Sequence, residues 1–336
     1  MQKNIVAAPQ LAEEGKQKIE WVKRNMPILQ QIETDFLEQQ YFRGLRVLVC
    51  IHLEAKTAYL AQVFASGGAE VAVTGSNPHS TKDDVVAALA ADGLHVYARY
   101  GATPEEMRQY MNLALDLKPH ILIDDGGDIV ELLHTDRKDL LAEVLGACEE
   151  TTTGVLRAKA RAKAGQLEFP VVLINDARCK YLFDDYHGTG QSVWDGVMRT
   201  TNLVISGKTV VIIGYGWCGK GCAERAQGLG ANVIICEVDP VKAADALMHG
   251  LRVMPMSEAA QQGDIFLTVT GNKHVIRKEH FSQMKNGAII CNAGHFKIEL
   301  DLEALRSMAV EQKEMRHNIS GFLMTDGRWL NLLGDG

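Results

Sequence analysis

No apolar run in this sequence approaches the ~20 residues that a membrane-spanning helix requires. The first residues, MQKNIVAAPQLAEEGKQKIEW, carry acidic side chains and lack the apolar segment of a secretory signal peptide. There is no CxxC pair and no paired His/Cys cluster, so no metal site is predicted. Basic residues are not in excess, and the net charge of −7 argues against binding to nucleic acid or to an anionic membrane.

What is present is typical of a globular protein of the cytoplasm. The 336 residues suit two domains better than a single core, and 46% of them are hydrophobic while 23% are charged. Of the seven cysteines, four lie in or beside apolar, strand-like runs, namely Cys50, Cys218, Cys236 and Cys291. Cysteines in such places are usually reduced and buried, which favours a reducing cytosol.

The order of apolar segments predicts α/β architecture. Residues 9–40 have apolar side chains at helical spacing, and the short run LRVLVCIH (residues 45–52) is typical of a buried parallel strand. The segments that follow residues 45 and 210 both run strand, turn, helix, strand. Further strand candidates are HILIDD, FPVVLIND, DIFLTVTG and GAIICNAG. We therefore predict two doubly wound Rossmann-like domains with parallel sheets, joined by a hinge near residues 183–199.

The stretch VVIIGYGWCGKG predicts a dinucleotide site. Gly214, Gly216 and Gly219 fit the G-x-G-x-x-G pattern directly after a strand and before a helix. Phosphates would bind at the N-terminus of that helix, where free N–H groups and the helix dipole favour an anion. Glu237 ends the next strand, and a carboxylate there accepts hydrogen bonds from a ribose diol and repels a 2′-phosphate. The pattern thus favours NAD over NADP.

Several predicted strands end in side chains that can transfer protons. They include His52, Asp124, Asp125, Asp176 and His295, and Lys180 lies in a following loop. Any one of them alone is more simply read as a surface or turn residue. Because the carboxyl ends of parallel strands meet at one sheet edge, the set as a whole indicates acid–base chemistry in several steps.

Eight motifs, taken in order, resemble those of the S-adenosylhomocysteine hydrolase family. They are HLEAKTAYLA, GAEVAVTGSNPHSTKDDV, ILIDDGGD, EETTTGV, FDDYHGTGQS, GYGWCGKGCA, TGN and CNAGHF. The resemblance covers residues 10–300 and implies a tightly held NAD. In that family the cofactor oxidises the ribose 3′-hydroxyl, homocysteine leaves C5′ by elimination, water adds, and the ketone is reduced again. The resemblance also implies a nucleoside substrate, a homodimer or homotetramer, and a place in the methyl cycle of one-carbon metabolism.

The resemblance implies roles for particular residues and a division of the chain. It implies a substrate domain over residues 1–186, an NAD domain over 187–316, and a truncated C-terminal return segment over 317–336. The implied catalytic residues are His52, Asp125, Glu150, Lys180, Asp184 and His295. The implied substrate-binding residues are Glu54, Thr57 and Asp185. The implied cofactor-binding residues are Thr151, Thr152, Thr153, Asp185, Gly214, Gly216, Trp217, Cys218, Gly219, Glu237, Val238, Lys242, Thr270, Asn272, Ala293, Gly294, His295 and Asn331.

The sequence departs from the family pattern in three places. Asp185 stands where the pattern has asparagine, and a carboxylate there is expected to pair with Lys180 and weaken it as a base. Lys82 stands where the pattern has glutamine. The sequence also stops at Gly336, after GRWLNLLGDG, where the family continues with a long helix and a tail.

Three other functions remain open at this stage. The chain could start with the same 3′-oxidation on another nucleoside, for example to eliminate water. It could be a non-catalytic NAD-binding homologue that acts through subunit association. A plain dehydrogenase needs only the glycine motif and none of the matches to HLEAKTAYLA or EETTTG.

Overall fold

The computed structural model describes residues 4–295 and 297–336. Phe296, the last residue of the CNAGHF motif, lies outside the described residues. The contacts divide the chain into unit 1, Met1–Asn175, and unit 2, Asp176–Gly336. Within residues 4–295 and 297–336, no helix combines the length and hydropathy needed to span a bilayer.

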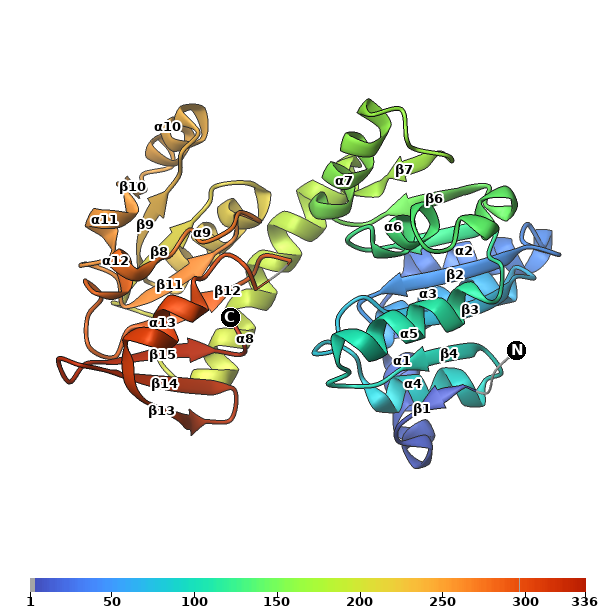
Figure 1. Ribbon diagram of the computed structural model, residues 1–336, viewed down its shortest axis with the longest axis horizontal. Helices are drawn as coiled ribbons and strands as arrows, with labels where there is room; N and C mark the ends of the chain where they lie inside the picture. The colour runs from blue at the N-terminus through green and yellow to red at the C-terminus, as the bar shows by residue number, and fades with distance from the viewer. Residues whose placement is uncertain (1–3, 296) are drawn as a thin grey trace. The chain divides into compact units, whose positions relative to one another are not determined.

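Unit 1 is a parallel sheet with helices on both faces (Figure 1). Its strand order is β1-β4-β3-β2-β5-β6-β7, and each neighbouring pair is parallel. The strands are β1 (Ile5–Val6), β2 (Arg46–Ile51), β3 (Glu70–Gly75), β4 (His95–Ala98), β5 (Ile121–Asp124), β6 (Gly146–Glu149) and β7 (Val171–Leu173). The helices are η1 (Pro9–Leu11), α1 (Ala12–Arg24), α2 (Pro27–Gln39), α3 (Ala55–Ser66), α4 (Asp83–Ala91), α5 (Pro104–Leu115), α6 (Asp128–His134), η2 (Lys138–Glu143), α7 (Thr152–Lys163) and η3 (Ile174–Asp176).

The core of unit 1 lies on the two faces of this sheet. Along β2, Leu48 and Cys50 face the cluster formed with α5 and α6, whereas Val47 and Val49 face the cluster formed with α1, α3 and α4. All four side chains are fully buried. Both faces of the strand are therefore apolar, as the run LRVLVCIH predicted.

The predicted helical stretch over residues 9–40 is two helices. Helix α1 ends at Arg24, and α2 begins at Pro27. Proline has no N–H to donate within a helix and suits the first helical position, so the chain turns here instead of continuing.

Unit 2 is a second doubly wound sheet, which gains antiparallel strands at one edge. Its strand order is β10-β9-β8-β11-β12-β15-β14-β13. The strands are β8 (Thr209–Ile213), β9 (Asn232–Cys236), β10 (Arg252–Val253), β11 (Ile265–Thr268), β12 (Ile289–Asn292), β13 (Ala309–Arg316), β14 (Ile319–Met324) and β15 (Trp329–Leu333). The helices are η4 (Lys180–Gly188), α8 (Thr189–Thr201), α9 (Trp217–Gly228), α10 (Pro240–Met248), α11 (Met256–Ala259), α12 (Lys278–Phe281) and α13 (Leu302–Met308).

The sheet of unit 2 differs from expectation in one respect. The sheet is parallel from β10 to β15, but β14 pairs antiparallel with β15 and with β13, so it is mixed rather than parallel throughout. Residues 317–336, expected as a return segment, contribute β14 and β15 to this sheet, where Phe322 and Leu330 are buried in its core. Residues 183–199, expected as a hinge, are helical: they comprise the end of the π-helical segment η4 and most of α8, which follows it directly.

All seven cysteines lie within the described residues and are free thiols. Cys50, Cys236 and Cys291 are buried on strands, as expected, and Cys222 is buried as well. Cys218 differs, because it lies in the first turn of α9 and is only half-buried.

Candidate functional site

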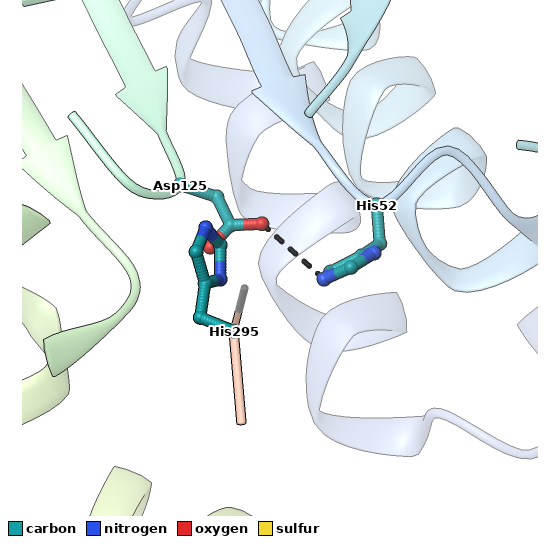
Figure 2. A group of neighbouring side chains, drawn as sticks. All are labelled: His52, Asp125 and His295. Carbon is teal, nitrogen blue, oxygen red and sulfur yellow. Dashed lines mark ion pairs between the residues drawn. The ribbon is translucent and has the colours of Figure 1, made fainter. Parts of the chain in front are cut away.

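In unit 1 a histidine and an aspartate follow the two central strands. His52 comes directly after β2 and Asp125 directly after β5, where the strand order changes direction. Figure 2 shows the pair, with His52 Nε2 3.5 Å from Asp125 Oδ2. Ser76 donates a hydrogen bond to the same oxygen at 2.7 Å, and the hydroxyl of Ser80 lies 2.6 Å from His52 Nδ1.

The environment of this pair suits proton transfer. The side chain of Asp125 is 1% exposed and that of His52 is 46% exposed. A buried carboxylate therefore orients an imidazole that solvent or a substrate can reach, and an imidazole can both accept and donate a proton. The crevice at the carboxyl ends of central strands is where open α/β sheets bind their ligands.

The two strands next to this site, β5 and β6, end in buried carboxyl groups, those of Asp124 and Glu149. They occupy paired positions on the parallel strands β5 and β6. Burial, and then the charge of Glu149, raise the pKa of Asp124 to about 8. Burial also raises the pKa of Glu149 to about 7, against the opposing effect of hydrogen bonds from Thr151 and Gly126. Both shifts favour the protonated form of these two carboxyl groups.

The EETTTG motif forms the entry to α7. The Glu150 N–H donates to the carbonyl of Asp124 at 3.0 Å. Thr151 is the N-cap of α7, with Thr152 and Thr153 in its first turn. The first N–H groups of a helix have no partner within it, and three threonine hydroxyls lie at this end of α7, a combination that can bind anions or sugar hydroxyls.

Glu54 and Thr57, the two predicted substrate-binding residues of HLEAKTAYLA, form hydrogen bonds to the backbone around His52 and the start of α3. The carboxylate of Glu54 caps α3 by accepting from the N–H groups of Lys56 and Thr57. The hydroxyl of Thr57 donates to the carbonyl of His52 at 2.5 Å, and Thr57 is buried. Both residues therefore support the turn that carries His52, and direct contact with substrate stays a prediction.

In unit 2 a lysine is held between two aspartates. Lys180 Nζ lies 2.6 Å from Asp185 Oδ1 and 3.2 Å from Asp184 Oδ2. The side chains of Lys180 and Asp185 are each 13% exposed, whereas that of Asp184 is 64% exposed. The pairing expected from the FDDYHG departure is therefore present, and it takes place largely out of water.

The glycine motif of unit 2 has the geometry of a dinucleotide site. Gly214 has a φ of 105°, which only glycine adopts readily. A Cβ at Gly219 would lie 2.2 Å from the carbonyl oxygen of Gly214, so helix and strand can pack this closely only around glycine. By contrast, no heavy atom of the described residues lies within 4 Å of a Cβ placed on Gly216. That open space at the N-terminus of α9 fits a pyrophosphate.

Glu237 is positioned to recognise a ribose. It follows β9, and its carboxylate accepts from the N–H groups of Tyr215 at 2.7 Å, Val238 at 2.7 Å and Asp239 at 3.0 Å. These bonds lock the carboxylate beside the glycine turn. The residues of this unit therefore fit NAD. Trp217, beside Gly216, stacks on Tyr181 with ring centroids 4.8 Å apart.

The remaining predicted cofactor residues of unit 2 fall into two groups. Those that follow the carboxyl ends of β9, β11 and β12 are Val238, Lys242, Thr270, Asn272, Ala293, Gly294 and His295, with Lys242 in α10. Asn331 differs, because it lies in β15 beside Ile289, the first residue of β12. Its side chain donates to the carbonyl of Gly287 at 3.3 Å, so the structure does not bring it to the edge that carries Gly294.

Sequence reasoning missed one residue of unit 2, Glu299. It is fully buried, and its carboxylate accepts from Thr270 N at 2.9 Å, Thr270 Oγ1 at 2.7 Å and Gly271 N at 2.7 Å. A Cβ on Gly294 would lie 1.8 Å from its Oε1. Glu299 therefore joins the turns after β11 and β12. A charged residue between Ile298 and Leu300 carries no sequence signal of such burial.

Comparisons with known proteins point to one family over nearly the whole chain. Residues 3–143 match the family model described as "S-adenosyl-L-homocysteine hydrolase", and residues 185–336 match "S-adenosyl-L-homocysteine hydrolase, NAD binding domain". The adenosylhomocysteinase of Pyrococcus abyssi is 55% identical over 326 residues, which cover 97% of this chain and 77% of the relative. The S-inosyl-L-homocysteine hydrolase of Methanocaldococcus jannaschii is 52% identical over 96% of this chain and 80% of its own length. The adenosylhomocysteinase of Nostoc sp. is 50% identical over 97% and 77%, respectively.

Proposed function

The chain belongs to the S-adenosyl-L-homocysteine hydrolase family, and we propose that it hydrolyses S-adenosylhomocysteine to adenosine and homocysteine with NAD as a resident cofactor. One observation carries the proposal: relatives named adenosylhomocysteinase are 50–55% identical over 97% of this chain. A plain dehydrogenase would need to share only the glycine turn, and an inert NAD-binding homologue would have no need of the His52–Asp125 pair.

The proposed reaction has no net change in oxidation state. Bound NAD would supply a reversible hydride acceptor for C3′ of the ribose. A ketone at C3′ makes the C4′ proton acidic, so the homocysteine thiolate can leave C5′ by elimination. Water then adds, with its hydroxyl to C5′ and a proton back to C4′, and return of the hydride to C3′ with a proton to the 3′-oxygen would give adenosine.

The proposal assigns separate tasks to the residues of the two units. In unit 1, His52 and Asp125 transfer protons to the thiolate and from the attacking water, and Glu150 holds a ribose hydroxyl. In unit 2, Lys180 takes the proton of the 3′-hydroxyl, Asp184 holds a ribose hydroxyl, and His295 orients the substrate. Lysine must be neutral to act as a base, so its ion pair with Asp185 at 2.6 Å opposes this step.

We also propose the finer assignments that the family resemblance implies. The substrate domain comprises residues 1–186, the NAD domain residues 187–316, and residues 317–336 are a C-terminal segment. The protein acts in the cytoplasm, in the methyl cycle, as a homodimer or homotetramer. Size-exclusion chromatography with light scattering tests the assembly, and a monomeric mass at micromolar concentration would contradict it.

A thiol assay tests the activity. NAD-loaded protein is incubated with S-adenosylhomocysteine, and released homocysteine is measured with a thiol reagent. Because some relatives are named for the S-inosyl compound, S-inosylhomocysteine is assayed in parallel. The proposal predicts faster release from the adenosyl substrate. Faster release from the inosyl compound would correct the nucleobase, and no release from either by folded, NAD-loaded protein would reject the function.

A further inference from the structure

We propose that Glu149 is a positioning residue, which sets the mutual orientation of the two turns that carry Asp125 and Glu150. The inference rests on the proposed function, because that function makes Asp125 and Glu150 catalytic. Glu149 itself is buried, with 1% of its surface exposed, and does not act on the substrate.

One oxygen atom of Glu149 connects the two turns. Asp125 and Gly126 follow β5, and Glu150 and Thr151 follow the neighbouring strand β6. Glu149 Oε1 accepts from Gly126 N at 3.0 Å and from Thr151 N at 3.0 Å. Each of these N–H groups belongs to the residue directly after a proposed catalytic acid. A shift of this oxygen would therefore move both acids.

Gly126 is held at its carbonyl group as well. Its carbonyl accepts from Arg157 Nη1 at 2.7 Å, and the same nitrogen lies 2.6 Å from Asp128 Oδ1. Gly126 has a φ of 97°, so the turn uses a conformation that other residues rarely adopt. Held at its N–H by Glu149 and at its carbonyl by Arg157, the turn has little freedom to rotate Asp125.

The carboxyl group of Glu149 fits tightly against Gly154, in the first turn of α7. A Cβ at position 154 would lie 2.1 Å from the carboxyl carbon, so any larger residue would displace the group. The second oxygen, Oε2, has no hydrogen-bond partner among the described residues. The functional contact of Glu149 is thus made by Oε1 alone, and an amide in its place keeps that acceptor.

Two nearly isosteric variants separate the acceptor from the volume of the side chain. Glu149→Gln keeps an oxygen for both N–H groups, and we expect a kcat within about threefold of the parent. Glu149→Met keeps the length but has no such acceptor, and we expect kcat to fall at least tenfold with KM changed less than threefold. Thermal unfolding and NAD content confirm that each variant is folded and loaded. A Glu149→Met variant with the parent kcat overturns the proposal.

A double-mutant cycle distinguishes positioning from a general structural role. If Glu149 acts through Asp125 and Glu150, Glu149→Met should lower kcat by less than about threefold in an Asp125→Asn/Glu150→Gln background, because the positions of these two residues then matter little. A purely structural role predicts the same loss in both backgrounds, and that result would refute the inference.

Two glycine variants test the inference if Glu149→Met does not fold. Gly154→Ala should push the carboxyl away from Gly126 and Thr151 and lower kcat at least tenfold. Gly196→Ala in α8 is the matched control, since no heavy atom of the described residues lies within 4 Å of a Cβ there, and it should leave kcat within twofold. Equal activity of the two variants would count against the role of Glu149.

Amide hydrogen exchange separates failure of this inference from failure of the proposed function. Glu149→Met, or Gly154→Ala in its place, should raise exchange at Gly126 and Thr151 at least tenfold, and Glu149→Gln should not. A parent protein that releases no homocysteine rejects the function, while the exchange rates still decide whether Glu149 holds the turns. Unchanged exchange rejects the inference whatever the activity.

Discussion

Replacing Asp185 by asparagine should speed the oxidation of a bound nucleoside. Lys180 can accept the proton of the 3′-hydroxyl only after losing its own proton. In the native chain that loss breaks a charge-assisted hydrogen bond to Asp185 at 2.6 Å, in surroundings where each side chain is 13% exposed. Asparagine keeps an oxygen acceptor of the same size but carries no charge.

The size of the effect follows from the difference between the two hydrogen bonds. A hydrogen bond to a charged group contributes about 1.5–3 kcal/mol, and a typical net contribution is about 0.5–1.5 kcal/mol. The variant should therefore favour neutral lysine by about 1.4 kcal/mol, or roughly tenfold in its population. Asp184 remains 3.2 Å away in both proteins, but its side chain is 64% exposed and water screens its charge.

The assay is a single turnover followed at 340 nm. NAD-loaded protein is mixed with adenosine at pH 7, and the first-order rise in absorbance reports oxidation of C3′. Asp185→Asn should raise that rate about tenfold. Asp195→Asn is the control and should change nothing, because Asp195 pairs with Arg199 at 3.0 Å on the exposed face of α8.

Equal rates for the native chain and Asp185→Asn would refute this reasoning. The proton on Lys180 would then not limit oxidation. A slower Asp185→Asn variant with full NAD content would point instead to a direct role of the carboxylate toward substrate or cofactor.

Three further predictions concern the cofactor site and the buried acids. Gly219→Ala should lose bound NAD, because its Cβ would lie 2.2 Å from the Gly214 carbonyl oxygen. Gly228→Ala is the control and should retain NAD, because a Cβ there has open space around it. The NAD content of each purified variant is measured after the nucleotide is released from the protein. Glu237→Gln should reduce the preference for NAD over NADP at least tenfold in fluorescence titrations, and an unchanged preference would show that the carboxylate does not select the cofactor. Since the pKa of Asp124 is raised from 3.8 to about 8, the folded state keeps a proton that the unfolded chain releases. The free energy of unfolding should thus fall between pH 4 and 8 by up to about 1.4 kcal/mol per pH unit for this group, and Asp124→Asn should flatten urea-denaturation data over that range.

The cofactor turn could be predicted from the sequence because it is local. Gly214, Gly216 and Gly219 lie within six consecutive residues, and the backbone of a strand–turn–helix unit dictates where glycine is required. The placement of His52 and Asp125 at adjacent strand ends followed from the same logic, since parallel strands present their carboxyl ends at one edge. The charge of Asp185 likewise predicted its pairing with Lys180, only five residues away.

Tertiary structure alone decided which acids are buried and what they hold. Glu149 and Glu150 are neighbours in sequence, yet Glu149 is enclosed between β5 and α7 while Glu150 is only half-buried. Glu299 has its partners at Thr270 and Gly271, and the sequence does not reveal that pairing. The local sequence pattern predicts backbone conformation, because that conformation depends mainly on residues adjacent in the chain. Burial and hydrogen-bond partners depend on the register between distant strands, which forms only when the sheet assembles.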